Sequence, residues 1–187
     1  MLVCVLGNLG TYTTIMLLQR YGLDKDQVAS KVAVMSIVSI VFLALASILG
    51  GILSDKLRKQ KVFVIGSSAV FIIALLIEAL APNFNVFLIG ACIGSFAYGV
   101  FICVDQALMV RILPNKEDAG KDMAIIGLPS GLATPTVSFI SPLILSFTSW
   151  TGYFYIFAVV AALSIFTIMP IPEMSPKTEE EKIALEA

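Results

Sequence analysis

Long apolar runs separated by short polar connectors dominate the chain. Each run is close to or longer than the roughly 20 residues that an α-helix needs to cross the hydrocarbon core of a bilayer. The pattern predicts spanning helices at residues 1–21, 28–53, 62–81, 84–110, 122–147 and 150–170. We therefore expect one six-helix transmembrane bundle over residues 1–170, followed by a polar cytoplasmic tail over residues 171–187.

Composition supports a lipid-embedded protein. Hydrophobic residues make up 58% of the chain, compared with roughly 45–50% in soluble domains. A soluble fold would have to bury several twenty-residue apolar runs inside one small core. The chain is accordingly predicted to be an all-α membrane protein with membrane lipid as its main surroundings.

The basic residues are unevenly divided between the two sets of connectors. Basic residues stay on the cytoplasmic side of a membrane far more often than they cross it. One side of the predicted bundle carries three of them, Arg20, Lys25 and Lys31, and the other carries nine: Lys56, Arg58, Lys59, Lys61, Arg111, Lys116, Lys121, Lys177 and Lys182. We predict a multi-pass protein of the cell membrane with both termini in the cytoplasm.

Several kinds of chemistry are not expected. The chain has no histidine, and its three cysteines, Cys4, Cys92 and Cys103, lie inside apolar runs, where a thiol behaves as a small hydrophobe. The sequence shows no glycine-rich phosphate loop and no basic patch of the kind that binds nucleic acid. We therefore expect no catalytic residue, no metal, no cofactor and no nucleic-acid partner.

A glycine, an aspartate and a run of basic residues stand between the second and third predicted helices. A glycine allows close helix packing, and an aspartate at a helix end can accept hydrogen bonds from the N-terminus of a neighbouring helix, so the segment can act as a breakable latch. The alternative is that the basic run only obeys the positive-inside rule. The segment runs Gly51, Ile52, Leu53, Ser54, Asp55, Lys56, Leu57, Arg58, Lys59, Gln60, Lys61.

This segment resembles the signature loop of the major facilitator superfamily, although Arg58 stands where that family usually has glycine. The resemblance implies that the six helices form one half of a major facilitator fold, the C-terminal half. It implies a secondary transporter that works by alternating access, with a missing N-terminal six-helix half as partner. The first apolar run begins almost at Met1, which fits an absent preceding half.

A second stretch is similar to bacterial members of that family that are distantly related to sugar and glycoside transporters. It comprises Val104 to Leu108, Leu113 to Asn115 and Glu117 to Asp122. This similarity implies a symporter that carries a small polar solute such as a sugar, with a proton or a sodium ion as coupling ion.

Two acidic residues lie inside predicted spans, away from the immediate ends of these spans. Asp105 is six residues before Arg111, roughly 9 Å inside the helix end at 1.5 Å per residue. In the family, an acidic residue at this place joins a charge relay with the residue that corresponds to Lys59; a proton-coupling role is the alternative. Glu78 lies near the outer end of its helix, where its carboxylate can reach the headgroups or take part in ion coupling.

Polar residues recur at helical spacing on three of the predicted helices and could line a hydrophilic path. The other interpretation is that serines and threonines bond to their own or a neighbouring helix. As substrate-binding residues we predict Asn8, Tyr12, Gln19, Tyr98 and Thr134, and as gating or relay residues Gly51, Asp55, Lys56, Lys59 and Asp105. Alternative functions are a stand-alone six-helix protein that forms a homodimeric pore or a scaffold, and one half of a drug exporter.

Overall fold

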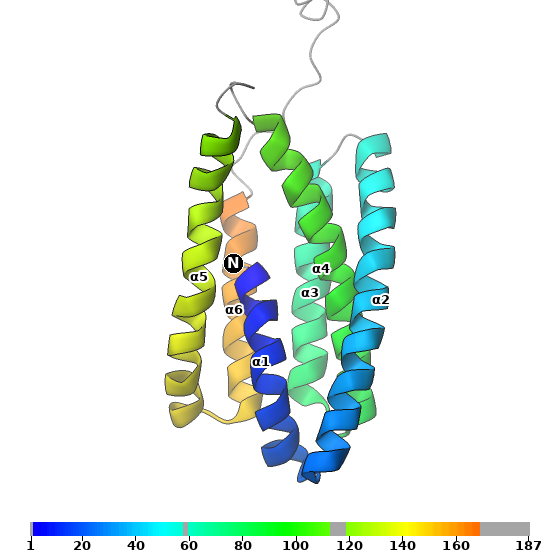
Figure 1. Ribbon diagram of the computed structural model, residues 1–187, viewed down its shortest axis with the longest axis vertical. Coiled ribbons are helices and arrows are strands. Elements are labelled where there is room, and N and C mark those ends of the chain that lie inside the picture. Colours follow the sequence, from blue (N-terminus) through cyan, green and yellow to red (C-terminus); the bar gives the residue numbers. More distant parts are fainter. Residues whose placement is uncertain (1, 58–59, 113–118, 169–187) are drawn as a thin grey trace, which may run out of the picture.

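The computed structural model consists of α-helices joined by short connections (Figure 1). It describes residues 2–57, 60–112 and 119–168; within these helices, the side chains of residues 2–11, 55–57, 60–61, 108–112 and some of α5 and α6 are not described. The helices are α1 (Leu2–Tyr21), α2 (Lys25–Leu57), α3 (Gln60–Leu80), α4 (Phe84–Ile112), α5 (Ala119–Phe147) and α6 (Trp150–Ile168). The six predicted helices are thus confirmed as helices. The predicted tail lies outside the described residues.

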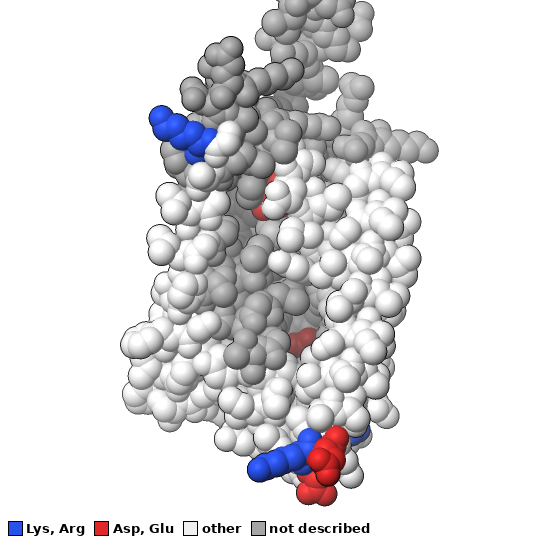
Figure 2. Space-filling view, in the orientation of Figure 1, with Lys and Arg blue, Asp and Glu red and all other residues white. Residues whose placement is uncertain are grey.

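Three of these helices are long and apolar enough to cross a membrane, judged on the described residues. They contain the segments Lys25–Ser54, Val62–Leu80 and Phe84–Ala107, whereas the apolar parts Pro135–Phe147 of α5 and Trp150–Leu163 of α6 are shorter. Among the described side chains, Lys, Arg, Asp and Glu gather at the two ends of the bundle (Figure 2). Between the ends, the described surface in this view shows no Lys, Arg, Asp or Glu apart from acidic atoms inside the central hollow.

Helices α2, α3 and α4 stand together on one side of the bundle, and α1, α5 and α6 on the other (Figure 1). The closest packing is of α2 and α3 against α4, while α3 also packs on α6 and α1 on α5. The core is formed by α1, α2, α3, α4 and α6 and includes Met16, Phe71, Leu75 and Phe154, each at most 2% exposed. Helix α3 therefore connects the two sides.

Glycine brings α2 and α4 unusually close. A Cβ atom placed on Gly99 of α4 would lie 2.5 Å from the Leu43 carbonyl oxygen and 2.9 Å from the Ala46 Cβ. The Ser47 hydroxyl donates to the Leu43 carbonyl at 2.8 Å and approaches the Gly99 carbonyl at 3.3 Å. Small residues at such crossings let helix backbones approach within a membrane.

The end of α3 is closed by side chains of α1. The Arg20 guanidinium donates to the carbonyl oxygens of Glu78 at 3.2 Å, Ala79 at 2.7 Å and Ala81 at 3.1 Å. The Tyr21 hydroxyl donates to the same Ala81 oxygen at 3.0 Å. The last carbonyls of a helix lack partners within it, so a cation here both satisfies them and complements the helix dipole.

Candidate functional site

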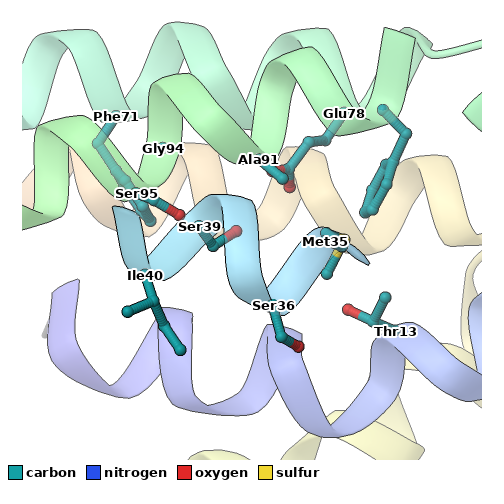
Figure 3. Close-up of a pocket in the computed structure, with 11 residues that line it drawn as sticks. Thr13, Met35, Ser36, Ser39, Ile40, Phe71, Glu78, Ala91, Gly94 and Ser95 are labelled. Carbon is teal, nitrogen blue, oxygen red and sulfur yellow. The ribbon is translucent and has the colours of Figure 1, made fainter. Parts of the chain in front are cut away.

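A cavity of about 300 Å³ lies between α1, α2, α3 and α4 (Figure 3). Apolar side chains, among them Met35, Ile40, Phe71 and Phe87, form part of its wall. The polar groups are the hydroxyls of Thr13, Ser36, Ser39 and Ser95 and the carboxylate of Glu78. An apolar pocket of this size with a few convergent polar groups is the usual form of a small-molecule site.

Glu78 is buried inside the bundle. Its side chain is 6% exposed, so the prediction that it reaches the headgroups is wrong. The physical reason is the shape of α4: a Cβ on Gly90 would lie 2.8 Å from the Glu78 Cγ, and one on Gly94 would lie 3.9 Å from Glu78 Oε1. The two glycines leave a groove that holds the Glu78 stem against α4.

The Glu78 carboxylate lacks a counter-charge in the described part of the chain. No hydrogen bond or ion pair to its oxygens is present there, and the side chain is buried. The nearby Arg20 guanidinium is bonded to backbone carbonyls, the Glu78 carbonyl among them. An unpaired carboxylate within a membrane span costs on the order of 2.5–3.5 kcal/mol or more. A bound ligand or a proton would offset this cost.

The hydroxyl groups of the cavity come from three helices. In Figure 3 the Glu78 side chain extends from α3 past Ala91 of α4 toward the space into which the Ser39 hydroxyl also points. Ser95 of α4 is 4% exposed, and Thr13 of α1 is 5% exposed. Hydroxyls both donate and accept hydrogen bonds, so this wall can solvate a polar group that enters the cavity.

Two of the predicted substrate-binding residues make hydrogen bonds between helices. The Tyr12 hydroxyl donates to the Ser138 carbonyl of α5 at 3.1 Å, and the Gln19 carbonyl oxygen accepts from the Trp150 indole of α6 at 3.1 Å. These bonds tie α1 to its neighbours away from the Glu78 cavity. Their role toward a substrate remains a prediction.

The other three substrate predictions are only partly described. Tyr98 is half-buried on α4 and has an interaction partner. The side chains of Asn8 and Thr134 lie outside the described ones.

Comparison with known proteins identifies the family. The family model of the Major Facilitator Superfamily matches residues 1–186. The chain belongs to the Major Facilitator Superfamily. It is also 28% identical over 184 residues to a protein named as an uncharacterized transporter from Buchnera aphidicola subsp. Schizaphis graminum (strain Sg). That match covers 96% of this chain but 44% of the relative, so the chain spans less than half of the relative's length.

The family match and the match to a transporter place the chain in a family of membrane transporters. Of the predicted gating residues, Gly51 packs on α4, because a Cβ there would lie 3.0 Å from the Cys103 sulfur. Asp105 is half-buried on α4. The side chains of Asp55 and Lys56, and all of Lys59, lie outside the described part, so the relay from Lys59 to Asp105 remains a prediction.

Ser36 and Ser39, which line this cavity, were not singled out from the sequence. Ser36 and Ser39 of α2 are three residues apart, and Gly90 and Gly94 of α4 are four apart, so each pair shares a helix face. The small-xxx-small spacing of the glycines marks a close helix contact. Combined with one embedded acid on the preceding helix, it is a signal that could have located the cavity.

Proposed function

We propose that the chain is one half of a secondary transporter that moves a small polar solute, such as a sugar, by alternating access. All six helices span the cell membrane in this proposal, with both termini in the cytoplasm. The single observation that carries it is the cavity with hydroxyl groups in its wall, inside a bundle whose described charges, apart from Glu78 and the half-buried Asp105, lie at its ends. A polar solute needs such a path because hydrocarbon offers it no hydrogen bonds.

The partner in this proposal is a second six-helix bundle. Support comes from the Buchnera transporter, in which the matching region is 44% of the length, and from repeat-built transporters, whose substrate sites lie where two repeats meet. Helices α2 and α5 carry large exposed apolar side chains, including Ile37 at 64%, Leu132 at 66% and Phe139 at 79%. Lipid and the second bundle would cover them together.

The solute would contact residues from both the predicted set and the cavity. Asn8, Tyr12, Gln19, Tyr98 and Thr134 would face the second bundle, where amide and hydroxyl groups can bond a sugar. The gating set Gly51, Asp55, Lys56, Lys59 and Asp105 would hold the cytoplasmic end closed and release it during the cycle. The hydroxyls of Ser36 and Ser39 would form part of the polar lining.

Uptake of labelled sugars and glycosides into membrane vesicles tests this function. The vesicles would come from cells that express the chain in its native gene context and from cells that express it alone. We expect saturable sugar uptake in the first preparation. Export of amphipathic dyes without sugar uptake would make the protein part of a drug exporter. Solute flux through homodimers of the chain alone would favour the pore.

A matched pair of serine variants on α2 sharpens this test. Ser39→Ala removes a cavity hydroxyl, whereas Ser30→Ala removes one that donates to the Gln27 carbonyl on the exposed surface. Loss of one substrate hydrogen bond of about 1 kcal/mol should raise the half-saturation concentration about fivefold. We expect this increase for Ser39→Ala only; equal values for both variants would remove the cavity from the transport path.

A further inference from the structure

The unpaired Glu78 carboxylate is the feature that the solute pathway alone leaves unexplained. A neutral sugar can be bound by hydroxyls and amides, and it does not require a buried acid. The acid is nonetheless built into the fold: Gly90 and Gly94 of α4 make room for its stem, and its side chain points into the cavity (Figure 3). Both observations concern geometry, and they indicate a ligand of positive charge.

The described groups around Glu78 do not pair with the negative charge of its carboxylate. On α1, Arg20 and Tyr21 are engaged with backbone carbonyls at the end of α3. The cavity walls contributed by α2 and α4 contain hydroxyl and apolar side chains but no charged group. Helix α6, which packs on the other side of α3, contains no Asp, Glu, Lys or Arg.

We propose that Glu78 is the proton-binding residue of the transport cycle. It holds a proton while the cavity is closed to water, and it releases the proton when the cavity opens. Protonation turns the carboxylate into a neutral group whose O–H can donate one hydrogen bond. The hydroxyl oxygens of Ser39 and Ser95 can accept such a bond. This inference rests on the proposed transport function and identifies the coupling ion and its site.

The cavity suits a proton better than a metal cation. Hard cations are held by about six oxygen ligands at short distance. Here one carboxylate and four hydroxyls are spread over four helices, Thr13 already has an interaction partner, and apolar side chains occupy the rest of the described wall. A proton needs only the carboxylate, and its binding removes the charge that the apolar wall disfavours.

A hydrophobic carbodiimide tests proton binding without any transport measurement. The reagent adds to a protonated carboxyl group in an apolar environment, and mass spectrometry locates the adduct. In membranes that contain the wild-type chain, we expect an adduct on Glu78 and none on the exposed Asp24 and Asp26. Above the pH of half-labelling, the labelled fraction should fall roughly tenfold per pH unit, as for a single titrating group.

Three outcomes of the labelling would overturn the proposal. The first is no adduct on Glu78 at acidic pH, and the second is an adduct whose yield does not change with pH. The third is protection by sodium ions at constant pH, which would make Glu78 a sodium ligand. The variant Gly90→Ala, which removes room for the Glu78 stem, should reduce the labelling; Gly66→Ala, with nothing within 4 Å of the new Cβ, should leave it unchanged.

Transport measurements then separate coupling from solute binding. In Glu78→Gln, which mimics the protonated state, we expect counterflow of labelled solute that no longer depends on pH, and no accumulation driven by a pH gradient. Glu78→Asp should restore part of the accumulation. Loss of counterflow and accumulation together in both variants, with normal membrane insertion, would assign Glu78 a structural role. If the wild type carries no solute while Glu78 still titrates, the transport function fails and the proton site stands.

Discussion

Arg20 shows what a single residue can contribute at the end of a membrane helix. Its guanidinium is bonded to three carbonyl oxygens beyond its own helix, those of Glu78, Ala79 and Ala81. Helix α3 has no basic residue in its own last turn. The cap on α3 therefore depends on α1, and the same cap fixes the backbone from which the Glu78 side chain extends.

We predict that Arg20→Gln destabilises the bundle by about 1–3 kcal/mol, since hydrogen bonds from a charged donor are lost and buried carbonyls remain unpaired. Unfolding of the purified protein in mixed micelles, followed by circular dichroism, measures this loss. Lys25→Gln is the control, because Lys25 is an exposed cation at the same end of the bundle. Equal losses in the two variants would show that the net charge of this end matters and the cap does not.

For some single residues, the sequence did not predict the side chain's direction or its partners. The sequence predicted Glu78 as an embedded acid, but distance from a helix end does not reveal which face the side chain takes. Gly90 and Gly94 of the next helix decide that, through the groove they leave. Tyr12 and Gln19 were placed on a polar face, but their partners on α5 and α6 depend on how those helices pack.

At the scale of helices, the apolar runs were informative because each one exceeds the length of a core helix in a soluble protein. Helix α2 nevertheless begins at Lys25, three residues before the predicted position. Gly22 has a φ of 59°, which turns the chain sharply after α1. The Val28 amide then donates to the Asp24 carbonyl at 2.9 Å, so α2 starts directly after this turn. Because the residues near Lys25 are polar, the predicted start of α2 was too late, although a helix tolerates polar residues there.

The contact between α2 and α4 yields a second prediction. Gly99→Ala places a Cβ 2.5 Å from the Leu43 carbonyl oxygen, so the helices must separate; we expect a loss of about 1–3 kcal/mol, as for overpacking in a core. Gly66→Ala adds a Cβ with no neighbour within 4 Å and should stabilise α3 by about 0.5–1 kcal/mol. Denaturant titration of both variants tests the contrast, and a Gly99→Ala protein as stable as wild type would contradict the close crossing.

For the whole molecule, the arrangement of charge connects the fold to the proposed cycle. Arg20, Asp24, Lys25 and Asp26 lie at one end of the bundle, where α1 turns into α2. Glu78 stands two residues before the end of α3 at that same end, close to the Arg20 cap. A proton that reaches Glu78 therefore has a shorter path from this end than from the end where α2 turns into α3.

From the positive-inside rule we expect the end with Arg20 and Lys25 to face the outside of the cell, because most Lys and Arg residues of the sequence belong to the other end. We predict that Lys25→Cys, in a background without Cys4, Cys92 and Cys103, is modified by a membrane-impermeant maleimide in intact cells. Arg58→Cys should react only after the cells are permeabilised. The proton would then reach Glu78 from outside, as solute import by symport requires. The reverse labelling pattern would mean that the protein has the opposite orientation in the membrane. The Glu78 cavity would then lie near the cytoplasm, and outward proton movement through Glu78 would have the shorter route.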